Sequence, residues 1–225
     1  APTMAITASG VSDGGTSNDG TLSLTFTSSE ATTDFAVSDI TVSGGSLGAL
    51  SGSGTTYTVT FTPSGAGATT IDVAGGAFTD AAGNNNTAAT QFNWTYDGTA
   101  PTLSSVSIAS NNSTTTLAKA DDVVTLTFTA SETIATPVVT FKSGDAAITD
   151  TSVTYENTSG NTWTAVYTTN ASDISGAVSY SIAFSDTVGN AGTAVTNGTG
   201  SVTFDKTAPT MAITASGVSD GGTSN

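Results

Sequence analysis

Cysteine, histidine and arginine are absent from this 225-residue sequence, whose three basic residues are Lys119, Lys142 and Lys206. The absence of cysteine excludes disulfides, thiolate metal sites and cysteine nucleophiles. Without histidine as well, the chain lacks the commonest general bases and activated nucleophiles of enzymes. No lysine lies in the first half, so an internal lysine–asparagine crosslink is excluded there. We therefore expect a protein that is not an enzyme.

Positive charge is scarce, since three lysines stand against 18 acidic residues and the net charge is −15. Nucleic acids and anionic membrane surfaces are bound through basic side chains, so neither is an expected partner. No apolar run reaches the roughly 18 residues that a membrane-spanning helix needs, and no membrane insertion is expected. The surplus of carboxylates favours cations as partners instead.

The apolar residues that are present alternate with threonine and serine. Alternation with a period of two predicts β-strands that have one buried and one solvated face. Threonine suits such strands because it is β-branched and presents a hydroxyl group to water. No stretch shows helical periodicity, so an all-β fold is predicted. The clearest alternating segments are LSLTFT (22–27), TYTVTF (56–61), FNWTY (92–96), VTLTFT (124–129), WTAVY (163–167), VSYSIAF (178–184) and VTF (202–204).

Repetition is the second pattern in the sequence. Residues 1–18 and 208–225 are identical, which indicates a segment of a longer tandem array. The halves between them share three landmarks in the same order: DGTAP with DKTAP, SSE with ASE, and FTDAAGN with FSDTVGN. The expected domains are residues 1–97 and 98–206, followed at 207–225 by the start of the next repeat. Seven short strands in about 100 residues predict two tandem immunoglobulin-like Greek-key β-sandwich domains, plus the first strand of a following repeat.

The D-x-T-A-P junction, the Ser-Glu pair after the shared LTFT strand and the D-x-x-G-N turn resemble bacterial Ig-like repeats of giant secreted and cell-surface adhesins. The resemblance covers essentially the whole chain. It implies a repeat that carries a distal binding module away from a bacterial cell, with neighbouring identical repeats as partners. It also implies calcium at the interdomain junctions and a location that is secreted or on the cell surface.

Strand order predicts where acidic turns gather. In a seven-strand sandwich, the B–C and F–G loops return to the pole at which the chain enters. At the junction of the two domains this gives six expected ligands: Asp97, Glu132, Asp186 and Asn190, with Asp13 and Asp19 from the facing A–B loop. At the first domain's entry the set is Glu30, Asp80 and Asn84, joined by an aspartate equivalent to Asp205. Oxygen-only ligands with several carboxylates select Ca²⁺ before Mg²⁺.

Tight turns use the same residue types without any metal, because Asp and Asn side chains hydrogen-bond to their own backbone. Both interpretations stay open. The acidic residues outside the recurring set are expected to be solvated: Asp39, Asp72, Asp145, Asp150, Asp173 and Glu156. The strand aromatics are expected in the core rather than in a sugar-stacking platform: Phe26, Tyr57, Phe61, Phe92, Trp94, Phe128, Trp163, Tyr180 and Phe184.

These observations predict a structural extender repeat of a long extracellular bacterial protein, stiffened by calcium between its domains. One alternative is a subunit of a self-assembling extracellular filament, sheath or surface layer, which would associate laterally through its threonine-rich faces. A second alternative is a carbohydrate-binding module that uses the loops near the calcium sites.

Overall fold

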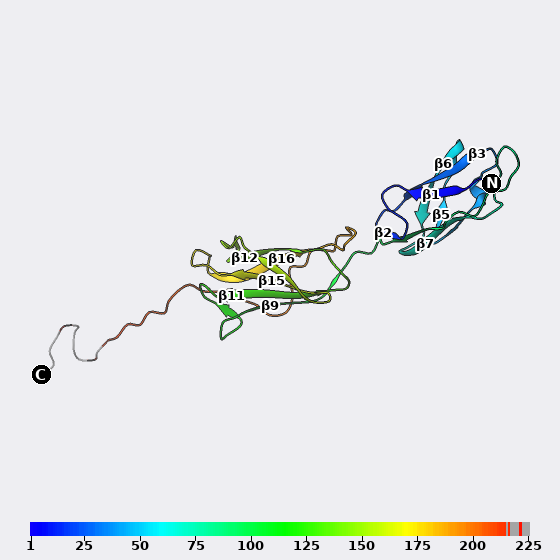
Figure 1. Ribbon diagram of the computed structural model, residues 1–225. Helices are drawn as coiled ribbons and strands as arrows, with labels where there is room; N and C mark the ends of the chain where they lie inside the picture. The colour runs from blue at the N-terminus through cyan, green and yellow to red at the C-terminus, as the bar shows by residue number, and fades with distance from the viewer. Residues whose placement is uncertain (215, 217–220, 222–225) are drawn as a thin grey trace. The chain divides into compact units, whose positions relative to one another are not determined.

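A computed structural model describes residues 1–214, 216 and 221 of the chain. Its contacts divide the chain into two compact units, each built from β-sheets (Figure 1). The first unit contains residues 1–102, 130–137 and 183–193, and the second contains residues 103–129, 138–182 and those from 194 onward. No helix in the described part of the chain is long and apolar enough to cross a membrane.

The first unit is a sandwich of two four-stranded sheets. One sheet has the order β1-β3-β6-β5 and the other β2-β8-β7-β4, and all neighbours are antiparallel except β2 and β8. Apart from the short β2, this is the ABED and CFG arrangement of an immunoglobulin fold. The elements are β1 (Met4–Ala8), β2 (Gly15–Ser17), β3 (Leu22–Thr32), η1 (Val37–Asp39), β4 (Ile40–Ser43), β5 (Gly45–Leu47), β6 (Ser51–Pro63), β7 (Gly67–Val73) and β8 (Phe92–Tyr96).

The strands of the second half follow the same plan. One sheet has the order β14-β15-β11-β9, and the other has the order β10-β17-β16-β12-β13, in which β10 and β17 are parallel. The strands are β9 (Leu103–Ser110), β10 (Leu117–Ala118), β11 (Val123–Ala130), β12 (Val138–Ser143), β13 (Ala146–Ala147), β14 (Thr154–Ser159), β15 (Thr162–Thr168), β16 (Gly176–Ala183) and β17 (Thr203–Phe204). The predicted all-β fold of tandem immunoglobulin-like sandwiches is confirmed.

Alternation along the strands produces the two faces of each sheet. On β3, Leu24 and Phe26 are fully buried, whereas Thr27 is exposed. The pairing of β3 with β6 sets Phe26 opposite Tyr57, which is also buried. Cross-strand partners share one face of a sheet, so this register keeps the apolar side chains between the layers.

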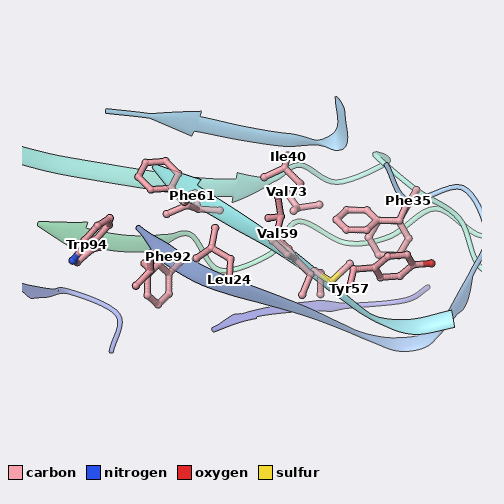
Figure 2. Packing of buried hydrophobic residues seen from close by; sticks show 14 residues of the cluster. Leu24, Phe35, Ile40, Tyr57, Val59, Phe61, Val73, Phe92 and Trp94 are labelled. Atoms are coloured by element: carbon pink, nitrogen blue, oxygen red, sulfur yellow. The ribbon is translucent and has the colours of Figure 1, made fainter. Parts of the chain in front are cut away.

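Aromatic rings fill the core of the first unit, and Figure 2 shows them between its strands. The rings of Phe61 and Trp94 meet edge to face with centroids 5.9 Å apart. Phe35 lies 5.2 Å from Tyr57 in a similar geometry. Eight of the nine strand aromatics expected in the core are buried, whereas Trp163, the second residue of β15, is half-buried.

The duplicated segment differs from its original. Met4 lies in β1 with only 5% of its surface exposed, whereas its copy Met211 is 88% exposed and Ile213 is 89% exposed. Residues 208–214 belong to no strand, because a strand needs a hydrogen-bonding neighbour and none of the described residues pairs with them. The rest of the expected next repeat, at 215, 217–220 and 222–225, lies outside the described residues.

Candidate metal centre

Three of the predicted ligands come together in the first unit. Asp97, Glu132 and Asp186 each offer a carboxylate oxygen, and these oxygens lie within 4.8 Å of one another. Two oxygens on opposite sides of one Ca²⁺ ion are separated by about 5 Å, since each Ca–O distance is about 2.3–2.6 Å. The three oxygens are therefore close enough to bind one ion.

Asp186 is held by the turn that it begins. Its Oδ1 accepts hydrogen bonds from the backbone N–H groups of Val188, Gly189 and Asn190 at 2.7–2.9 Å. Gly189 has a φ of +100°, which glycine adopts without strain. The side chain is 3% exposed. The D-x-x-G-N sequence thus fixes this carboxylate before any ligand arrives.

Two opposing effects act on the pKa of Asp186. Burial raises it, but the hydrogen bonds from the side chain and backbone of Asn190 and from the backbone of Gly189 and Val188 outweigh burial. The pKa of Asp186 therefore lies below its usual value, and the carboxylate is charged at neutral pH.

Glu132 lies in the loop that follows β11. The turn that carries it is tied to the Asp186 turn, because Ile134 and Asp186 form a β-bridge and the Ala135 N–H donates to Ser185 at 2.9 Å. Burial and the charges of Asp97 and Asp186 raise the pKa of Glu132. Three carboxylates gathered in this way repel one another unless a cation lies among them.

Asp97 lies in the linker, which hydrogen bonds hold at both ends. Its backbone N–H donates to the carbonyl of Ser17 at 3.0 Å, and its Oδ1 accepts from Thr99 at 3.1 Å. Further along, Thr102 and Ser131 exchange two hydrogen bonds of 2.8 and 3.0 Å. The linker aspartate is thereby brought to the same place as the two loops.

Asn190 lies beside the carboxylates, as predicted, but its side-chain NH₂ group donates hydrogen bonds to other groups of the protein. Its Nδ2 donates to Oδ2 of Asp186 at 2.7 Å and to the backbone carbonyl of Asp97 at 2.8 Å. Its Oδ1 accepts a hydrogen bond of 3.4 Å from Asn18. Sequence reasoning missed Asn18, although it immediately precedes the predicted ligand Asp19.

Asp13 and Asp19 do not belong to this carboxylate group. Oδ1 of Asp13 accepts a 2.7 Å hydrogen bond from the backbone of Asn93, the neighbour of Trp94 on β8. Oδ2 of Asp19 accepts one of 3.0 Å from the hydroxyl of Ser17. Both side chains therefore support the backbone next to β2.

In the set predicted at the entry of the first domain, Asp80 and Asn84 form a hydrogen-bonded turn. Oδ1 of Asp80 accepts hydrogen bonds of 2.9 Å from the backbone of Ala82 and Asn84, and Oδ2 accepts one of 2.9 Å from the Asn84 amide. The bonds from the side chain and backbone of Asn84 lower the pKa of Asp80. Glu30, at the end of β3, is exposed. Asp205 is exposed in the second unit, where its Oδ1 accepts from the backbone of Thr207 at 2.8 Å.

One acidic residue expected in solvent is buried. Asp173 is 2% exposed, and its Oδ1 accepts hydrogen bonds from the backbone and the hydroxyl of Thr149 at 2.8 Å. Its Oδ2 accepts a third from the backbone of Asn170 at 2.8 Å. The prediction was wrong because Thr149 is 24 residues away in the sequence, so this partner gave no local signal.

A family comparison finds a match for the first of the two sandwiches. Residues 1–96 match the family model described as bacterial Ig-like domain. The first sandwich is therefore similar to bacterial Ig-like domains, and the match covers 96 of the 225 residues of the chain. The predicted resemblance is confirmed over this range. Bacterial Ig-like domains occur in extracellular or surface proteins and are typically structural rather than enzymatic.

Solved structures that are similar to this chain share low sequence identity with it. InvD of Yersinia pseudotuberculosis is 18% identical, and the match covers 95% of this chain and 60% of that chain, with a TM-score of 0.37. Titin domains I67–I69 are 11% identical over 91% of this chain and 63% of theirs, with a TM-score of 0.41. Bovine butyrophilin is 11% identical over 87% and 99%, with a TM-score of 0.34. No curated protein matches the chain.

Proposed function

We propose that the chain is a structural extender repeat of a long extracellular or surface protein, stiffened by Ca²⁺ bound between Asp97, Glu132 and Asp186. The similarity of the first sandwich to bacterial Ig-like domains supports the extracellular, structural part of this proposal. The observation that carries the calcium part is the convergence of three carboxylates, from a linker and two loops, within 4.8 Å.

The donor set favours Ca²⁺ on chemical grounds. All three groups are carboxylates, and hard oxygen ligands without imidazole or thiolate favour Ca²⁺ or Mg²⁺. Mg²⁺ demands near-ideal octahedral geometry and retains water, whereas Ca²⁺ accepts six to eight oxygens in flexible arrangements. Ligands from three separate segments are better suited to the more flexible ion.

The bound ion would act as a crosslink. Asp97 belongs to the linker, Glu132 follows β11, and Asp186 follows β16. An ion that binds all three fixes the linker to both loops and neutralises their mutual repulsion. Turn chemistry and ion binding are compatible at Asp186, because a carboxylate has about four lone-pair sites. An equivalent seam would join Glu30 and Asp80 to the linker aspartate of a preceding repeat.

Calorimetric titration of the full chain with CaCl₂ tests the proposal. Extracellular calcium modules bind with a Kd of roughly 10⁻⁴ to 10⁻³ M, and we expect heat of binding in that range. Glu132→Gln removes one ligand charge and should abolish that heat or weaken binding at least about tenfold. Glu156→Gln removes the same charge from exposed β14 and should leave the binding unchanged.

Two results would count against the calcium proposal. One is the absence of any Ca²⁺-dependent heat up to several millimolar. The other is an equal loss of Ca²⁺ affinity in Glu132→Gln and Glu156→Gln, which would show that binding depends on the net charge alone.

A further inference from the structure

The outer edge of β1 has backbone groups that no described residue pairs with. Among the described residues β1 pairs with β3 alone, at the end of the sheet β1-β3-β6-β5. The carbonyl of Thr3 and the N–H of Ser9 bond to β3 at 3.0 Å, so the odd-numbered residues face that strand. Backbone groups of an antiparallel strand alternate in direction, and those of Met4, Ile6 and Ala8 therefore point away from the sheet.

A groove runs beside this edge. It has a volume of about 480 Å³, and its apolar lining includes Ile6, Ala8, Val11 and Phe92. Asp13 also lines it, and this carboxylate already accepts the N–H of Asn93. A free strand edge next to an apolar groove can accept another strand by main-chain hydrogen bonding.

The edge carries none of the charges that normally protect such strands. Residues 2–12 contain no acidic or basic side chain, although the chain as a whole has a net charge of −15. Natural edge strands are usually short, bulged, covered, or marked by lysine and other charges. β1 is therefore a neutral edge, at which local charge repulsion between two such acidic chains is weak.

Six other sheet edges in the described part of the chain are short, covered or charged. The corresponding strand β9 is covered by residues near Thr199, which exchanges two hydrogen bonds with Val106 and Ile108 at 2.8 and 3.1 Å. The edge strand β14 carries Glu156 and an irregular register. The edges β2, β5, β10 and β13 have two or three residues each. Among the described edge strands longer than four residues, β1 is therefore the one without such protection.

We propose that β1 pairs with β1 of a second copy of this chain, antiparallel and about a twofold axis. In this arrangement Ile6 lies opposite Ile6 of the second copy, and Met4 lies opposite Ala8. The sheet then continues across the axis as eight strands. An antiparallel pair of identical strands is self-complementary, as a twofold dimer requires. The association is lateral, and it stands independently of calcium at the seam.

Cysteine crosslinking tests the register, because the natural chain has no cysteine. In the proposed pair Ala5 lies opposite Thr7 of the second copy as a non-hydrogen-bonded pair, with Cα atoms about 4.5 Å apart. That distance permits a disulfide. Mixed Ala5→Cys and Thr7→Cys chains should form a covalent heterodimer under mild oxidation in EDTA. Each variant alone should crosslink several-fold more slowly, because its cysteines are out of register.

A second experiment measures association without a crosslink. The natural chain in EDTA should show concentration-dependent dimers in sedimentation equilibrium. Thr7→Lys places a charge on the edge and should abolish them, whereas Thr58→Lys, on the same sheet face in the interior strand β6, should not. Equal crosslinking of all cysteine combinations, or a chain that stays monomeric at millimolar concentration, would overturn the proposal.

Discussion

At the scale of the residue, Asp186 and Asp80 show how one turn motif fixes a carboxylate through hydrogen bonds from its own backbone. Each carboxylate accepts the N–H groups of its own turn, and each remains charged because those bonds lower its pKa. The difference lies in their surroundings, since Asp186 meets Asp97 and Glu132 within 4.8 Å. The same turn motif therefore becomes a candidate ion site only where other segments supply further carboxylates.

Asp122 allows a residue-scale prediction in the second unit. Hydrogen bonds from the Asn112 amide and from the backbone and side chain of Lys119 lower the pKa of Asp122 to about 2. Asn112→Ala should raise this pKa toward its usual value of 3.8, as a carboxyl ¹³C titration by NMR would show. Asn157→Ala, an exposed change on β14, should leave it unchanged.

The sign of the stability effect follows from that depressed pKa. The unfolded chain binds the proton of Asp122 more tightly than the folded chain does. The contribution of Asp122 to the free energy of unfolding is therefore present above the unfolded pKa of 3.8 and is lost as the pH falls toward 2. Asn112→Ala should reduce that acid sensitivity, and an unchanged pKa for Asp122 would contradict the assignment.

At the scale of the element, glycine lets the covering segment approach β9. A Cβ atom on Gly200 would lie within 2.4 Å of the carbonyl oxygen of Ile108, and the residue has a φ of +77°. One on Gly198 would lie 2.5 Å from the carbonyl of Val106. Only glycine fits so close to another backbone, so these residues keep the edge of β9 protected.

Gly200→Ala should therefore destabilise the second unit by about 1–3 kcal/mol, the usual cost of backbone strain at such positions. Gly160→Ala is the matched control, because Gly160 also has a positive φ of +55° but no atom within 4 Å of its added Cβ. Urea unfolding followed by tryptophan fluorescence measures both. Equal losses would show that φ alone, rather than close packing on β9, sets the cost.

At the scale of the whole molecule, the sequence predicted what depends on local pattern. Alternation identified strands such as β3 and β11, because the burial of every second residue appears as a pattern in the local sequence. The short strands β2 and β10 were not identified. They have two or three residues and pair in parallel with segments that are distant in the sequence. The burial of Asp173 was also missed, because its partner Thr149 is distant in the sequence.

The candidate site was predictable in part because strand order fixes which loops share a pole. Asp97, Glu132 and Asp186 converge as that rule requires. Asp13 and Asp19 were expected beside them, but each accepts a hydrogen bond from a neighbour near β2 instead. Side-chain direction in a loop depends on individual hydrogen bonds, and the alternating pattern says nothing about those.

The central claim is that one Ca²⁺ ion joins the linker to both loops. A crystal structure of the full chain grown in millimolar CaCl₂, with anomalous data to identify the ion, tests it most directly. The account predicts one calcium ion bound to oxygens of Asp97, Glu132 and Asp186 at about 2.3–2.6 Å. Three carboxylates surrounded only by water in such a crystal would contradict it.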